Sequence, residues 1–68
     1  MYEKLEKIVE SNPDLEVVVD FLGGKNTSYK YYAKLFNTYT RDNIAIMPGC
    51  SVDNALISLN NYAEVHNL

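Results

Sequence analysis

The only cysteine and the only histidine of this sequence are the side chains best suited by type to nucleophilic or acid–base chemistry. Cys50 stands just before a stretch with a helical pattern, and a helix N-terminus lowers the pKa of a thiol. His66 lies at the other end of that stretch, so the rise of an α-helix puts about 24 Å between the two residues. This distance excludes a Cys–His dyad within one chain. We expect Cys50 to fill a turn, and His66 to lie favourably near the negative end of the helix dipole.

The sequence patterns that could indicate a metal site, a phosphate loop or acid–base catalysis are better explained by structural roles. One cysteine and one histidine cannot supply the four ligands of a structural zinc ion, and a lone cysteine allows no disulfide within the chain. Gly23-Gly24-Lys25-Asn26 lacks the glycine spacing of a P-loop and leads into a strand pattern, which favours a hairpin turn. Glu16 and Asp20 are spaced for solvated ion pairs with lysines. We therefore expect a protein that is not an enzyme and has no cofactor, metal or small-molecule substrate.

Length and composition narrow the class of protein further. A chain of 68 residues has room for a single domain, and domains of this size commonly need a disulfide, a metal or a partner subunit for stability. The formal net charge of −3 is not typical of nucleic-acid binders, which normally have a basic field. No apolar run approaches the ~20 residues of a membrane helix, and a lone cysteine fits a reducing compartment. We expect a cytoplasmic protein without a membrane segment.

Two stretches, residues 2–11 and 52–66, have the apolar periodicity of amphipathic helices. Asn12-Pro13 ends the first, because the residue before a proline avoids the helical region, and Ser51 is a favourable N-cap for the second. The predicted buried stripe of the second helix consists of Val52, Ala55, Leu56, Leu59, Tyr62, Ala63 and His66, widened by Ile57 and Val65. The polar positions Asp53, Asn54, Ser58, Asn60, Asn61 and Glu64 are predicted to face water.

Between the helices, three stretches predict strands: residues 15–22, 28–36 and 44–47. The first two alternate between apolar and mixed positions and are separated by a glycine-rich turn, as in a hairpin. With the turn centred near Lys25, the core-facing pairs are Phe21–Tyr29, Val19–Tyr31, Val17–Ala33 and Leu15–Leu35. The pairs on the opposite face are Asp20–Lys30, Val18–Tyr32 and Glu16–Lys34, which place two ion pairs around one apolar pair. Pro48-Gly49 is predicted to end the third strand.

The predicted fold class is α+β, with the elements in the order α-β-β-β-α. Two amphipathic helices can cover one face of a three-stranded antiparallel sheet, which gives a two-layer sandwich with one open sheet face. Val18, Tyr32 and Phe36 form an apolar stripe on that open face, and Leu22 lies near its end. Exposed apolar patches and tyrosine are typical of interfaces. We therefore expect a protein partner on these four residues, either another protein or a second copy in a homodimer.

The element order resembles that of the double-stranded RNA-binding domain. The most similar segment is Gly49-Cys50-Ser51-Val52-Asp53-Asn54-Ala55, where the family has glycine, serine and an alanine-rich helix. The family's lysine cluster at the start of that helix and its Gly-Pro-x-His loop are missing here. The resemblance implies the fold and, as an alternative function, duplex RNA binding. The basic surface would then have to come from Lys4, Lys7, Lys25 and Lys30.

A second, partial resemblance is to HicB-type antitoxins. Their strand-loop-strand-Pro-Gly-Cys-helix segment is similar to the stretch from Tyr31 through Met47-Pro48-Gly49-Cys50 to Leu56. Small acidic proteins of this shape also occur among phage-encoded inhibitors of host defence. This likeness adds a further alternative, an inhibitor of a host enzyme encoded by a phage or mobile element.

Overall fold

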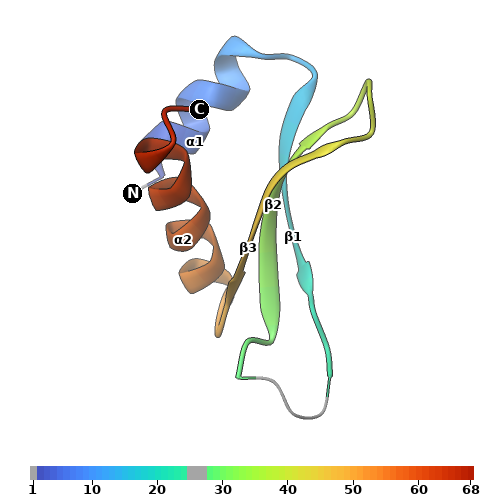
Figure 1. The fold of residues 1–68 in the computed structure, drawn as a ribbon, viewed down its shortest axis with the longest axis vertical. Coiled ribbons are helices and arrows are strands. Elements are labelled where there is room, and N and C mark those ends of the chain that lie inside the picture. The colour runs from blue at the N-terminus through green and yellow to red at the C-terminus, as the bar shows by residue number, and fades with distance from the viewer. Residues whose placement is uncertain (1, 25–27) are drawn as a thin grey trace.

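The computed structural model describes residues 2–24 and 28–68 and has the predicted order α-β-β-β-α. The elements are α1 (Glu3–Ser11), β1 (Leu15–Phe21), β2 (Tyr31–Asn37), β3 (Asn43–Gly49) and α2 (Val52–Val65). The strands form one antiparallel sheet in the order β1-β2-β3. Both helices lie on the same side of this sheet (Figure 1). The predicted α+β fold class is thus confirmed.

The core lies between the helices and the sheet face that they cover. Its buried hydrophobic side chains are small or medium-sized, and eight of them form one cluster: Leu5, Ile8, Ala33, Leu35, Ala45, Ala55, Leu59 and Ala63. Four alanines in that cluster allow α2 to approach β2 and β3 closely. The largest fully buried side chains are Leu35 and Leu59, one from each layer.

Helix α1 is held at its C-terminal end by Asn12, whose Nδ2 donates a hydrogen bond of 2.8 Å to the carbonyl oxygen of Ile8. The backbone of Asn12 is extended, as expected for a residue before proline. At the N-terminal end, Tyr2 makes no side-chain capping hydrogen bond. The backbone N–H of Leu5, in the first turn of α1, instead donates a hydrogen bond to a side chain of α2.

Helix α2 begins at the predicted N-cap. The Oγ of Ser51 accepts a hydrogen bond of 3.0 Å from the backbone N of Asn54, and the Oδ1 of Asn54 accepts one of 3.3 Å from the backbone N of Cys50. The two bonds satisfy one backbone donor in the first turn of α2 and one directly before its N-cap. Four positions of the predicted stripe differ from the prediction, because Val52, Ile57, Val65 and His66 are exposed.

Asn60 is the main exception to the predicted polarity of α2, because it is buried instead of facing water. Its Oδ1 accepts a hydrogen bond of 3.1 Å from the backbone N of Leu5, and its Nδ2 donates one of 3.2 Å to the Oε1 of Glu64. The prediction failed because α1 packs against this side of α2. One orphan N–H in the first turn of α1 finds its acceptor there.

The β1–β2 register differs from the prediction by two residues. The Cα partners are Val19 with Ala33 and Val17 with Leu35 on the core face, and the N–H of Leu22 bonds to the carbonyl oxygen of Lys30 at 2.8 Å. The pairs are therefore centred on position 26 instead of position 25. The predicted turn centre, Lys25, lies with residues 26 and 27 outside the residues that the structure describes. Gly23 and Gly24 both have positive φ, so the chain leaves β1 in a conformation that favours glycine.

This shift preserves the faces and changes the partners across the strands. On the open face, Glu16 lies opposite Phe36, Val18 opposite Lys34, and Asp20 opposite Tyr32. The predicted cross-strand pairs Glu16–Lys34, Val18–Tyr32 and Asp20–Lys30 are therefore wrong. The core-facing pairs Phe21–Tyr29, Val19–Tyr31, Val17–Ala33 and Leu15–Leu35 are wrong for the same reason. Phe21 now pairs with Tyr31, with their ring centroids 5.7 Å apart in an edge-on arrangement.

Strand β3 is longer than predicted, since Pro48 and Gly49 belong to it. An edge strand tolerates a proline, because one side of its backbone has no ladder partner. Gly49 is buried beside α2, and a Cβ added there would lie 2.3 Å from the backbone N of Ala55. Glycine is therefore required by the close approach of strand and helix. A β-bulge interrupts the β2–β3 ladder near the start of β3, where Leu35 pairs with Ala45 and Phe36 pairs with Asn43.

Candidate functional site

The open face of the sheet carries a lysine at its centre. Lys34 lies in the middle of β2, opposite Val18 of β1 and Ile46 of β3. Its Nζ lies 4.9 Å from the ring centroid of Phe36 and 6.0 Å from that of Tyr32. Both distances are within the range of cation–π attraction, so the ammonium group is held against the sheet surface.

Apolar side chains from all three strands surround this lysine. Val18, Tyr32 and Phe36 are half-buried by their neighbours, and Ile46 is 48 % exposed. We call these four residues together with Lys34 the open-face patch. Both helices lie on the other side of the sheet, so no described element of the chain covers the patch (Figure 1). Two carboxylates of β1, Glu16 and Asp20, are on the same face.

Three of the four candidate residues predicted for partner binding belong to this patch. Val18, Tyr32 and Phe36 lie on the open face, as their alternation indicated. Leu22 lies one residue beyond β1 and is 50 % exposed, so it is outside the strand ladder of the patch. Ile46 was missed, although its alternation with the core residue Ala45 would have placed it on this face.

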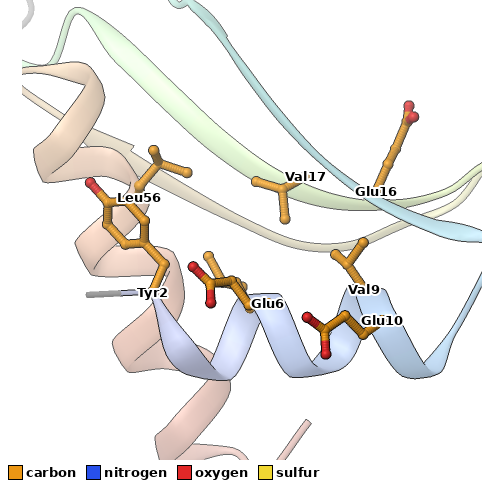
Figure 2. A pocket seen from close by; sticks show the side chains of 8 residues that line it. Tyr2, Glu6, Val9, Glu10, Glu16, Val17 and Leu56 are labelled. Carbon is orange, nitrogen blue, oxygen red and sulfur yellow. The ribbon is translucent and has the colours of Figure 1, made fainter.

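A groove of about 530 Å³ runs between α1 and β1 on the other side of the molecule. Its apolar lining comes from three elements and consists of Tyr2, Leu5, Val9, Val17 and Leu56. Figure 2 shows Val17 pointing from β1 toward α1, with Tyr2, Glu6, Val9 and Glu10 along the helix. Three carboxylates also line the groove, Glu6 and Glu10 from α1 and Glu16 from β1. Sequence periodicity missed this groove because it depends on how α1 is placed relative to the sheet.

Tyr2 closes one end of this groove and links the two helices. Its hydroxyl donates a hydrogen bond of 2.9 Å to Oδ1 of Asp53, in the first turn of α2. The hydrogen bond to this carboxylate raises the pKa of the Tyr2 hydroxyl above its usual value. Asp53 therefore accepts from Tyr2 as well as lying near the positive end of the α2 dipole.

The chemistry-bearing residues of the sequence do not come together. Cys50 is exposed before the N-cap of α2, and His66 is the C-cap residue at its other end. The ring of His66 packs on that of Tyr62, with centroids 4.1 Å apart. Across residues 2–24 and 28–68, no group of three or more histidine, cysteine, aspartate or glutamate side chains is arranged to hold a metal ion.

The lysines of the RNA-binding alternative lie on separate elements. Lys4 and Lys7 are on α1, and Lys30 directly precedes β2. In Figure 1, α1 lies in the upper half of the view, whereas the start of β2, next to Lys30, lies in the lower half. The fourth candidate, Lys25, lies outside the described residues.

Comparison of the chain with protein-family models, with curated proteins and with solved structures finds no match. Within the part of the chain that the structure describes, neither helix is long and apolar enough to cross a membrane. The α-β-β-β-α topology is compatible with a fold like that of the double-stranded RNA-binding domain. Function is therefore inferred from the surfaces of the molecule.

Proposed function

We propose that this chain is a non-enzymatic interaction protein that associates through the open-face patch, and that a second copy of the chain is its partner. The observation that supports the proposal is the arrangement around Lys34, where apolar residues of three strands enclose one charge and no described element covers them. An apolar sheet face of this kind gains free energy when another surface removes it from water.

Lys34 restricts what can cover the patch. Burying its ammonium group without a partner would be costly, so the covering surface must bring a carboxylate close to Nζ. The same face of a second copy offers two carboxylates, Glu16 and Asp20, next to apolar residues of similar size. Two copies packed face to face can therefore pair each Lys34 with a carboxylate of the other copy, as a two-fold symmetric interface requires.

The small size of the domain supports self-association. A chain of 68 residues buries a limited core, and this core contains four alanines among its eight buried hydrophobic residues. Covering the open face would add Val18, Tyr32, Phe36 and Ile46 to the buried surface. Full burial of one large apolar side chain is worth about 1.5–3 kcal/mol, so even partial burial of four offsets part of the entropic cost of association.

Sedimentation velocity over a range of protein concentrations tests the proposal. The wild-type chain is expected to shift from monomer to dimer below about 1 mM, whereas Val18→Lys with Tyr32→Glu, which places charges in the patch, stays monomeric. Ile57→Lys with Val65→Glu is the matched control, because both residues are exposed on α2, and it is expected to dimerise like the wild type. A wild-type monomer throughout, or dimerisation unchanged by the patch variant, contradicts the proposal.

Duplex RNA binding is the second candidate, and the order of the elements is what favours it. Lys4, Lys7, Lys25 and Lys30 would have to hold phosphates, and affinity would fall steeply with salt. A titration of duplex RNA at low salt distinguishes the candidates. Binding that Lys4→Glu with Lys7→Glu abolishes, in a chain that stays monomeric, would favour RNA over self-association.

A further inference from the structure

The groove between α1 and β1 combines an apolar floor with carboxylates and has no basic lining residue among the described side chains. Tyr2, Leu5, Val9, Val17 and Leu56 form the floor, and Glu6, Glu10 and Glu16 are the charged members of the lining. The volume of about 530 Å³ is within the ~300–1,000 Å³ of ordinary ligand sites. The groove is thus large enough for several side chains of a peptide.

The charges of α1 are sorted around the helix. Glu6 and Glu10 are four residues apart and therefore lie on one flank, next to Val9 on the groove side (Figure 2). Lys4 and Lys7, from the same helix, are not among the groove-lining residues. The groove side of α1 is therefore acidic, although the whole helix has nearly balanced charges.

The carboxylates of the helix are available to a ligand. Glu6 and Glu10 are exposed, and Figure 2 draws both side chains in front of the helix ribbon. Glu16, at the edge of the sheet, is also exposed and points away from α1 (Figure 2). A ligand that places apolar side chains on the floor would therefore have the carboxylates next to those of its side chains that lie at the rim of the groove.

We propose that this groove is a docking site for a basic amphipathic segment of a partner protein, with apolar side chains on the floor and lysine or arginine side chains at Glu6 and Glu10. Charge complementarity and the apolar floor together define this occupant. The floor residues, Glu6 and Glu10 lie on the helix-covered side of the sheet, whereas Glu16 at the sheet edge is common to the groove and to the proposed dimer face. The test below changes Glu6 and Glu10 and leaves Glu16 intact, so its outcome is independent of self-association through the open-face patch.

The test uses two synthetic amphipathic peptides of equal length, one of leucine and lysine and the other of leucine and glutamate. The full chain, labelled with ¹⁵N and ¹³C, is titrated with each, and chemical-shift changes are mapped by residue. The leucine–lysine peptide is expected to shift signals of the floor residues, including Val17 and Leu56, and to bind more weakly as salt rises. The leucine–glutamate peptide is expected to leave these signals unchanged.

A charge-matched pair of variants separates the groove from general attraction to an acidic protein. Glu6→Lys with Glu10→Lys is expected to weaken binding of the leucine–lysine peptide by about tenfold or more. Asp14→Lys with Asp42→Lys changes the net charge equally at exposed positions outside the groove lining, and is expected to change affinity by less than about threefold.

The proposal would be overturned if both variants lost the same affinity for the leucine–lysine peptide, or if the two peptides bound equally well. Chemical-shift changes confined to residues outside the groove would also overturn it. The mapping on the wild-type chain gives a result even if the Glu6→Lys, Glu10→Lys variant fails to fold. Peptide-induced shifts on the open-face patch instead of the groove would assign the basic segment to that face and would equally reject the groove as its site.

Discussion

The side chain of Asn60 and the backbone of Leu5 are joined by a buried hydrogen bond across 55 residues of sequence. The acceptor is Oδ1 of Asn60 in the middle of α2, and the donor is an N–H in the first turn of α1. Because Tyr2 supplies no side-chain cap, α2 provides part of the N-terminal capping of α1. This bond ties the first turn of α1 to α2, and α1 in this position forms one wall of the groove.

Replacement of Asn60 by leucine is expected to destabilise the fold by about 1–3 kcal/mol, because the buried N–H of Leu5 loses its acceptor while the side-chain volume stays similar. Urea denaturation measures the loss, and hydrogen exchange of the Leu5 amide is expected to become faster. Asn61→Leu, at the exposed neighbouring position, is the control. A loss no larger than that of Asn61→Leu would show that the bond contributes little.

Replacement of Gly49 by alanine is expected to cost about 3 kcal/mol, because the new methyl group would overlap the backbone of Ala55. The nearest atoms are the backbone N at 2.3 Å and Cα at 2.6 Å, which α2 cannot move without leaving the sheet. Thermal unfolding of Gly49→Ala checks this cost. Because the overlap involves backbone atoms, adding Ala55→Gly is not expected to rescue stability, and a full rescue would contradict the described packing.

The hydrogen bond from Tyr2 to Asp53 is expected to make stability depend on alkaline pH. Since the bond raises the pKa of Tyr2, its contribution is present below about pH 10, the usual tyrosine pKa, and is lost as pH rises through the raised value. Tyr2→Phe is therefore expected to be less stable than the wild type at neutral pH. The difference is expected to disappear at pH values above the raised pKa.

Urea denaturation of the two proteins at a series of pH values is the measurement. Tyr39→Phe changes an exposed tyrosine that lies outside the groove and the core, so its stability is expected to follow that of the wild type across the series. A gap between Tyr2→Phe and the wild type that persists unchanged at high pH would argue against the bond as its cause.

Much of the architecture could be predicted from periodicity. Strands have a side-chain period of two, so an error of two residues in the hairpin register left Val17 and Val19 on the core face and Val18 on the open face. Ser51 was recognisable as an N-cap because its role depends on local sequence. The order of elements and the two-layer arrangement follow from the same local patterns.

The predictions that failed concern residues whose positions depend on contacts between segments that are distant in the sequence. Asn60 looks like a surface residue until α1 is placed beside it, and Gly49 looks like a strand terminator until α2 is placed against it. The cross-strand partner of Lys34 changed because the centre of the hairpin moved by one position, which put Val18 opposite Lys34 in place of the expected Glu16. Without that ion pair, the ammonium group lies against Phe36 and Tyr32 of its own strand. The central charge of the candidate site therefore became visible only in three dimensions.

The most direct measurement of self-association through the open-face patch is a charge-swap mixing experiment. One chain carries Lys34→Glu, and the other carries Glu16→Lys with Asp20→Lys. Sedimentation of each variant alone is expected to show a monomer at concentrations where the wild type dimerises, because like charges then meet in the interface. An equal mixture of the two is expected to recover a dimer, because the introduced glutamate of one chain would face the introduced lysines of the other. A mixture that stays monomeric, or variants that dimerise alone as strongly as the wild type, would contradict the account.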